Sequence, residues 1–285
     1  MSFSPRSSGL NGVRLAAAFG LAAALVAAPA LAAPGTDQNT DKTFETFRKD
    51  AFGDKAIERD SALLTIDAPI RAEDAAVVPI DVNVTLPKDD PRTVKAVTLI
   101  VDENPSPVAA TFTLGQERRE FALSTRLRVN AYSSVRAVLE TSDGQLHMAA
   151  RFVKASGGCS APALKDEDQA MANLGQLKFR PAVANASAKP RDDGSSDAQL
   201  MIRHPNYSGL QMDPIDRTYI PARFVNKIVV KQGEATVFTM EGGISLSEDP
   251  AIQFSYLPGA APVTVNAQDT EGVQFSGEMQ GRPKS

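Results

Sequence analysis

VPIDVNV, residues 78–84, is the stretch that decides the fold, because Val or Ile occupies every second position along its whole length. Successive side chains of a β-strand point to opposite faces, so this alternation predicts a strand with one face in a core. Similar alternating or apolar segments of strand length are residues 64–66, 94–101, 109–114, 120–123, 126–130, 135–140 and 146–153. Turn-forming residues separate them at 88–91, 104–107 and 142–144. Short strands at this spacing, with no long helical run between them, predict an antiparallel sandwich of immunoglobulin-like type.

The alternation returns in the last third of the chain and predicts a second, smaller sandwich. Its strand candidates are residues 198–203, 224–231, 234–240, 251–256, 262–267 and 273–279. Residues 155–197, between the two halves, are irregular and end in a stretch rich in Pro, Gly, Ser and Asp, which is typical of a linker. A helix is favoured over residues 165–174 within this stretch. We therefore expect residues 155–197 to be an arm and a linker between two sandwiches.

A short amphipathic helix, or two turns of helix interrupted at Gly53, is expected before the first sandwich at residues 44–60. Within residues 44–60, the apolar positions close to helical spacing are Phe44, Phe47, Ala51 and Phe52. The predicted fold is thus all-β, with two immunoglobulin-like sandwiches in tandem at residues 34–154 and 198–285 and a short N-terminal helix.

The first 33 residues have the pattern of a secretory signal peptide. Arg6 and Arg14 precede an apolar run over residues 15–28, and the small-residue pattern of a cleavage site follows at residues 30–32. A retained membrane anchor is the alternative, but the run is shorter than the ~20 residues that a spanning helix needs. We expect residues 1–33 to be cleaved and the mature protein to be periplasmic, with no membrane attachment.

Composition and motifs argue against several classes of function. The formal net charge is −4, Trp is absent and no Lys/Arg-rich run stands out, so a nucleic-acid partner is not expected. The two histidines, His147 and His204, lie in different predicted sandwiches and have no metal-binding spacing with the single cysteine. The sequence also contains no C-x-x-C, G-x-S-x-G, P-loop or G-x-G-x-x-G motif. We expect no metal, no cofactor and no catalytic residues, and therefore no enzyme activity of the protein by itself.

The single cysteine, Cys159, is the main candidate for chemistry. It follows the last predicted strand of the first half in the sequence SGGCS, residues 156–160. One cysteine in an exported chain has no partner for an internal disulfide, which suggests a reactive thiol or pairing with another molecule. The alternative is an inert, buried side chain, since free cysteines are commonly interior. Because Gly157 and Gly158 precede it and glycine favours backbone mobility, we expect an exposed thiol on a mobile arm.

Several spaced segments resemble known sulfur oxidation proteins. Residues 68–82, 101–107, 125–128 and 142–144 resemble SoxY, the substrate-carrier subunit of bacterial thiosulfate oxidation, and residues 153–159 resemble its swinging arm. Residues 202–209 and 219–230 resemble SoxZ. The whole mature chain is similar to the fused SoxYZ-like carriers that are associated with quinoprotein dehydrogenases.

The resemblance implies a covalent carrier. Cys159 would bear a sulfur-containing, thiosulfate-type intermediate, Gly157 and Gly158 would be the hinge of the arm, and the two sandwiches would pack on each other in cis. Periplasmic sulfur-oxidation enzymes or a quinoprotein dehydrogenase system would be the partners. The chain departs from SoxY in having Ser160 after the cysteine and in continuing to residue 285, so the arm is tethered at both ends.

Two other classes of function stay open at this point. A non-covalent adaptor of a periplasmic quinoprotein dehydrogenase would tolerate loss of the thiol, whereas a carrier would not. A thiol enzyme, such as a sulfur transferase, would turn over substrate without a partner. We rank the carrier first, the adaptor second and the enzyme third.

Overall fold

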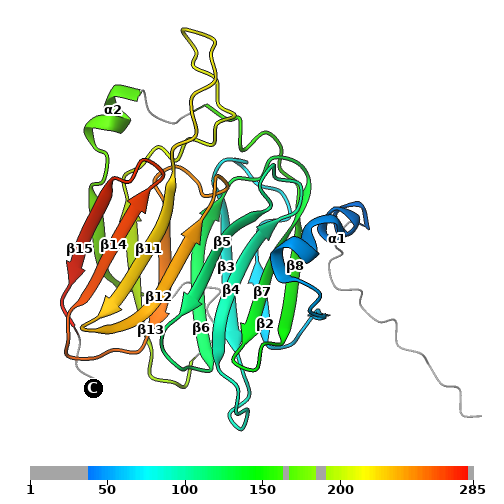
Figure 1. Ribbon diagram of the computed structural model, residues 1–285, viewed down its shortest axis with the longest axis vertical. Helices are drawn as coiled ribbons and strands as arrows, with labels where there is room; N and C mark the ends of the chain where they lie inside the picture. The colour runs from blue at the N-terminus through cyan, green and yellow to red at the C-terminus, as the bar shows by residue number, and fades with distance from the viewer. Residues whose placement is uncertain (1–37, 163–166, 184–190, 282–285) are drawn as a thin grey trace, which may run out of the picture. The chain divides into compact units, whose positions relative to one another are not determined.

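The alternating segments form β-strands that pair into two sheets facing each other across one core (Figure 1). The computed structural model describes residues 38–162, 167–183 and 191–281. The predicted signal peptide, residues 1–33, lies outside the described residues. The all-β, immunoglobulin-like fold class is confirmed.

The first half contains one helix and eight strands within the described residues. They are α1 (Gln38–Phe52), β1 (Ile57–Arg59), β2 (Leu64–Asp67), β3 (Val78–Thr85), β4 (Val94–Val101), β5 (Val108–Leu114), β6 (Glu120–Leu127), β7 (Ser133–Thr141) and β8 (Leu146–Val153). The second half contains α2 (Glu167–Ala172), β9 (Leu177–Ala182), β10 (Ser196–Ile202), β11 (Val225–Gln232), β12 (Ala235–Gly242), β13 (Ala251–Tyr256), β14 (Val263–Asp269) and β15 (Gln274–Met279).

The two halves are joined through both sheets. One sheet has nine strands in the order β1-β8-β7-β4-β5-β12-β11-β14-β15, and the other has six in the order β2-β3-β6-β13-β10-β9. β5 of the first half pairs antiparallel with β12 of the second, with Phe112 opposite Met240. β6 pairs antiparallel with β13, with Leu123 opposite Phe254. The halves therefore pack in cis, edge to edge.

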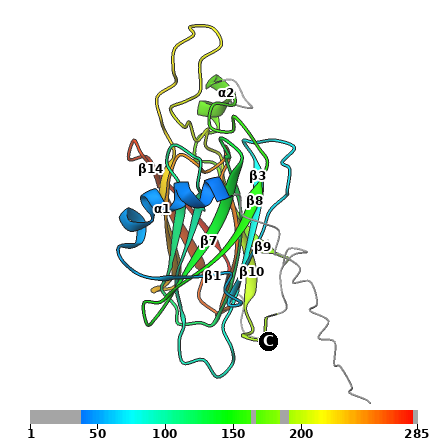
Figure 2. The same ribbon diagram turned by 90° about the vertical axis from the view of Figure 1, so that its right-hand side faces the viewer.

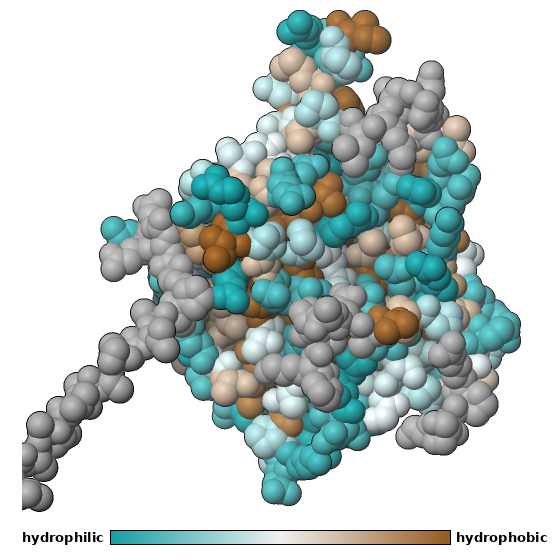
Figure 3. Space-filling view, turned by 180° about the vertical axis from the view of Figure 1, so that it is seen from behind, coloured by the Kyte–Doolittle hydropathy of each residue, from teal (hydrophilic) through white to brown (hydrophobic). Residues whose placement is uncertain are grey.

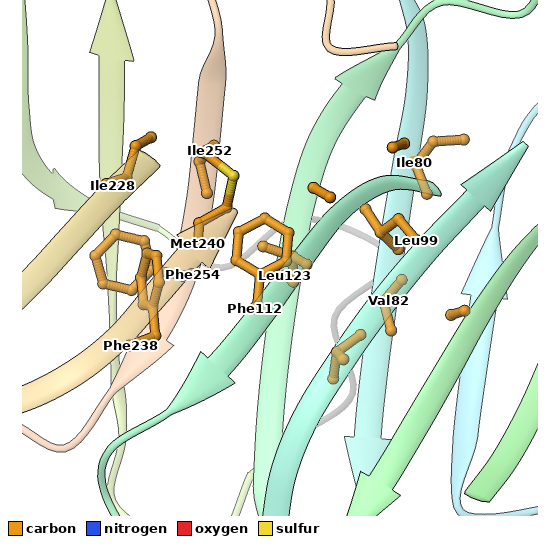
Figure 4. Packing of buried hydrophobic residues seen from close by; sticks show 14 of the residues in the cluster. Ile80, Val82, Leu99, Phe112, Leu123, Ile228, Phe238, Met240, Ile252 and Phe254 are labelled. Atoms are coloured by element: carbon orange, nitrogen blue, oxygen red, sulfur yellow. The ribbon is translucent and has the colours of Figure 1, made fainter. Parts of the chain in front are cut away.

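A continuous apolar core crosses this seam (Figure 4). Phe112 from the first half lies 5.7 Å, between ring centroids, from Phe238 of the second, and Phe238 lies 4.8 Å from Phe254. All three side chains are fully buried. Since burying a Phe side chain contributes roughly 1.5–3 kcal/mol, the seam has a substantial hydrophobic contribution of its own.

Helix α1 lies against the nine-stranded sheet beside β7 and β8 (Figures 1 and 2). Phe44 is fully buried, and the buried Arg136 of β7 lies over its ring at 4.4 Å. The helix ends at Phe52, before Gly53, whose amide donates to Lys49 O and whose φ is +66°. A glycine in this conformation is a common helix C-terminal cap. The helix therefore begins before the predicted region of residues 44–60 and ends before that region does, because residues 57–59 form β1, which pairs parallel with β8.

The stretch predicted as arm and linker contains additional regular structure. Helix α2 falls within the expected helical region, and β9 pairs antiparallel with β10 at the edge of the six-stranded sheet. Sequence analysis missed β9 because it is short and contains Pro181, a residue that strands tolerate mainly at sheet edges. None of the helices in the described ranges is long and apolar enough to cross a membrane.

Candidate functional site

The short segment after β8, residues 154–162, crosses one end of the sandwich, the upper end in Figure 1, and it contains Cys159. β8 ends at Val153, and residues 154–162, called the cysteine segment below, follow it outside the strands of both sheets. The amide of Gly157 donates to Asn130 O at 2.8 Å, and the amide of Gly158 donates to Val129 O at 3.0 Å. The segment is thus held against the loop between β6 and β7, and we call this conformation the docked state.

The two glycines each meet a structural requirement of the docked state. Gly157 has a φ of +79°, in the left-handed region that side chains disfavour. At Gly158, a β-carbon would lie 2.1 Å from Ala75 O and 2.7 Å from Val129 O. Because these are backbone atoms, no residue with a side chain fits there without movement of the segment. The role of both glycines as a hinge stays a prediction.

The second half of the chain holds the cysteine segment from the other side. Ser208 Oγ donates to the carbonyl oxygen of Cys159, and Gln211 Nε2 donates to Ala161 O at 3.0 Å. Ser208 and Gln211 are buried. They belong to the base of a hairpin-like loop, residues 207–223, whose two arms are joined by the bridges Tyr207–Arg223 and Met212–Tyr219. The site is therefore composed of residues from both halves.

The prediction of an exposed thiol is wrong for the docked state, because Cys159 is fully buried. Its small neighbours allow the backbone to pack closely against two loops, which sequence analysis interpreted as mobility. Burial raises the pKa of the thiol from 9.0 to about 11, and the positive charge of Arg128 opposes this only in part. Since the thiolate is the nucleophile, the docked cysteine is a poor one at neutral pH.

Arg128 is a buried cation at the centre of the site. It is 1% exposed, Nη1 donates to Gly158 O at 3.1 Å, and Nη2 donates to Asn206 O at 3.3 Å. Its Nε has no hydrogen-bond partner among the residues that the structure describes. Burial lowers the pKa of Arg128, while the charges of Cys159, Glu248 and Asp74 act in the opposite direction. The guanidinium thus links the cysteine segment to the second half.

Asn104 fixes the loop that carries Arg128. Its Nδ2 donates to Arg128 O at 2.7 Å and to Ser245 Oγ at 2.8 Å, and its Oδ1 accepts from the Asn130 amide at 2.8 Å. Asn104 is itself buried. Sequence analysis did not assign Asn104, Arg128 or Ser208 to the site, although each lies within a segment that carried the family resemblance.

Both histidines have partners within the protein. His204 is buried, and its Nδ1 accepts from the Asn206 amide at 3.0 Å while Nε2 lies 3.4 Å from Asp269 Oδ2. His147 Nδ1 lies 2.6 Å from Glu58 Oε2. Within the described ranges, no group of three or more His, Cys, Asp or Glu side chains is arranged to hold a metal ion.

Exposed apolar side chains gather at the end of the sandwich that holds the cysteine segment. The hairpin-like loop projects from this end, and apolar atoms are visible at its tip (Figures 1 and 3). The exposed side chains on this loop are Met212, Ile215 and Tyr219, and those on neighbouring loops are Ile70 and Tyr132. Such clustering is typical of a surface that contacts another molecule.

Two family models match the chain in succession. The model of sulfur oxidation protein SoxY matches residues 48–159, so its match ends at the cysteine, and the model of sulphur oxidation protein SoxZ matches residues 184–280. The two matches cover the two halves in the order that the sequence motifs predicted.

Solved structures also resemble parts of the chain. The sulfur carrier protein SoxY from Chlorobium limicola f thiosulfatophilum is 26% identical over 40% of this chain and 96% of that chain, with a TM-score of 0.34. A superoxide reductase (neelaredoxin) from Ignicoccus hospitalis is 14% identical over 34% of this chain and 94% of that chain, with a TM-score of 0.28. No curated protein matches the chain.

Proposed function

Because the chain joins a SoxY domain to a SoxZ domain and is a fused SoxYZ-like protein, we propose that it carries a sulfur-containing group covalently on Cys159 and presents it to partner enzymes. This domain content supports a carrier role in sulfur oxidation. The position of the only cysteine supports the covalent attachment in this proposal. This cysteine lies where the SoxY match ends, on a segment outside the strands of both sheets.

A carrier of this kind must leave the docked state to react. Five hydrogen bonds of residues 157–162 would break, namely those of Gly157 N, Gly158 N, Gly158 O, Cys159 O and Ala161 O, while the two backbone hydrogen bonds of Lys154 can remain. Each is worth about 0.5–1.5 kcal/mol net, and the released segment regains conformational entropy, which offsets part of this cost. No strand pairing has to break, so the undocked form is accessible as a minor state.

Undocking also restores the reactivity of the thiol. In water the pKa of Cys159 returns from about 11 to 9.0, so the thiolate fraction near neutral pH rises about 100-fold. Joining this sulfur to thiosulfate forms a sulfur–sulfur bond and a terminal sulfonate, and it releases one proton and two electrons. A partner oxidoreductase must accept those electrons. The reaction therefore needs a redox partner, such as a sulfur-oxidation enzyme or a quinoprotein dehydrogenase system, and the carrier is not itself the enzyme.

The proposed location of this function is the periplasm, after removal of residues 1–33. The partner would approach the end of the sandwich that holds the cysteine segment, because the undocked cysteine emerges there. The exposed apolar side chains of the hairpin-like loop at this end suit such a contact.

Intact mass of the mature protein from its native periplasm, before and after reductant, tests the carrier function. We expect a reductant-labile increment of at least one sulfur atom on wild-type protein and none on Cys159→Ser, which should fold normally. The matched control Ser160→Ala keeps the thiol and should keep the increment. An unmodified thiol in protein from cells that are oxidising sulfur compounds would refute the covalent carrier.

A second candidate function is a non-covalent adaptor of a periplasmic quinoprotein dehydrogenase. The full burial of Cys159 favours it, since an inert thiol needs no access to solvent. Replacing Cys159 with Ser separates the two functions, because an adaptor would still support its dehydrogenase after the thiol is lost.

A further inference from the structure

The buried arginines of the described residues differ in how their charge is balanced. Arg118 lies 2.9 Å from Asp193 Oδ2, and Arg136 lies 2.6 Å from carboxylate oxygens of both Asp102 and Asp41. Arg128 is as deeply buried as these two, but it forms no ion pair with any carboxylate of the described residues. Its hydrogen bonds go to two backbone carbonyl oxygens.

A buried charge without a counter-ion is costly, because protein groups replace water poorly around it. The charges of Asp74 and Glu248 act on Arg128 and offset part of this cost. The thiol of Cys159 does not balance the charge, since burial keeps it protonated at neutral pH. The charge of Arg128 is therefore balanced only in part, by Asp74 and Glu248, when the cysteine carries nothing.

The position of Arg128 relative to the cysteine segment indicates which group would balance it. Nη1 already contacts the carbonyl of Gly158, the residue before the cysteine, and Nε has an unused N–H. A guanidinium binds oxyanions such as sulfonates through several N–H groups at once, and these charge-assisted hydrogen bonds are stronger than neutral ones.

We propose that Arg128 is the counter-ion of an anionic group carried on Cys159, so that the site binds negatively charged sulfur adducts in preference to neutral ones. This inference rests on the proposed carrier function and specifies its cargo. A terminal sulfonate on the cysteine would draw the loaded segment toward Arg128, whereas a neutral adduct of similar size would not. The carrier would thereby hold charged cargo away from solvent between encounters with partners.

Two reagents modify the thiol, one with an anionic group and the other with a neutral group. Tetrathionate reacts with the thiolate to form a cysteine thiosulfonate, which is anionic, and releases thiosulfate. Methyl methanethiosulfonate reacts with the thiolate to form a neutral methyl disulfide and releases methanesulfinate. Both reactions use the full-length mature protein, and intact mass shows how completely each adduct forms.

The rate at which dithiothreitol removes each adduct measures how well it is protected. Dividing the rate for the same adduct on glutathione by the rate on the protein gives a protection factor that cancels the intrinsic reactivity. In wild-type protein we expect the protection factor of the anionic adduct to be about tenfold larger than that of the neutral adduct. A tenfold factor corresponds to about 1.4 kcal/mol, which is in the range of one charge-assisted hydrogen bond.

Variants at two arginines complete the test. Arg128→Gln should make the two protection factors equal, and Arg128→Lys should keep part of the difference. Arg126→Gln is the matched control, because Arg126 donates to Asp249 O and not to the cysteine segment, and it should behave as wild type.

The outcomes separate this inference from the carrier function. Equal protection of the two adducts on wild-type protein overturns the role of Arg128, even if Arg128→Gln fails to fold. A difference that persists in Arg128→Gln also overturns it. A thiol that accepts neither reagent in the folded protein counts against both the carrier function and the inference, whereas complete loading with equal protection leaves the carrier function standing.

Discussion

Replacing Gly158 with alanine should release the cysteine segment and expose the thiol. The added β-carbon would lie 2.1 Å from Ala75 O, far inside van der Waals contact, and 2.7 Å from Val129 O. The two loops that supply these oxygens are joined to each other by the hydrogen bond from Val129 N to Ala75 O at 2.8 Å. We therefore expect the cysteine segment to move rather than the loops.

The size of the effect follows from the ionisation of the thiol. Docking raises the pKa of Cys159 from 9.0 to about 11. Below pH 9, a difference of two pKa units lowers the thiolate fraction by about 100-fold. Wild-type protein should therefore react with iodoacetamide at pH 8 about 100-fold more slowly than an exposed thiol, and Gly158→Ala should recover most of that factor.

Intact mass at timed intervals measures the rate of alkylation, and variants at two further glycines provide comparison rates. Gly157→Ala places a side chain at a φ of +79° with no atom closer than 3.9 Å, so it adds strain of roughly 1–2 kcal/mol and raises the rate by roughly 5- to 30-fold. Gly144→Ala adds similar strain in a turn remote from Cys159 (φ +82°) and should leave the rate unchanged. If Gly158→Ala alkylates at the wild-type rate with its sheets intact by circular dichroism, close approach at Gly158 does not protect the thiol.

Three further perturbations test other contacts. Gln211→Ala removes the hydrogen bond to Ala161 O and should raise alkylation of Cys159 by about fivefold, since such a bond is worth ~1 kcal/mol; an unchanged rate would show that the second half does not hold the segment. The thiol has a higher pKa in the folded protein than in the unfolded chain. The folded state therefore keeps its full stability below pH 9.0 and loses stability as the pH rises toward about 11, because the unfolded chain then releases the proton of Cys159 first. Wild-type protein should therefore lose about 1.4 kcal/mol of unfolding free energy relative to Cys159→Ser by pH 10, and parallel pH profiles of the two would contradict this. Asp102→Ala leaves the buried Arg136 with one carboxylate fewer and should cost roughly 3–5 kcal/mol in urea unfolding, a loss that an unshifted midpoint would rule out.

Most strands were predictable because their signal is local. In β3, the Val and Ile residues at every second position are all buried and Pro79 between them is exposed, as a period of two requires, although Asn83 is also buried. The strand candidates of the second half fall on β10 to β15 with small shifts at their ends. The helix before the first sandwich was also predictable, but its end was not, because Gly53 is compatible with either a cap or an interruption.

The sequence was sufficient to predict the central residue of the candidate site, Cys159, but not that this residue is buried. Cys159 is conspicuous as the only thiol, and its position after the last strand of the first half is readable from the alternation. Its burial depends on Ser208 and Gln211, which lie some fifty residues away in sequence and contact the segment only after the halves have joined. Sequence patterns contain no information on such non-local contacts when no periodicity connects them.

The sequence by itself thus determined the all-β class, the order of the two halves and the cysteine that is the candidate for carriage, because each depends on residue type and local spacing. Only the tertiary structure decided that the halves share both sheets, that the diglycine permits close packing, and that Arg128 is buried against the cysteine segment with no ion pair to a carboxylate of the described residues. Glycine illustrates the physical reason. Its missing side chain permits both a mobile backbone and a close approach between backbones, and only the surrounding atoms decide which of the two occurs.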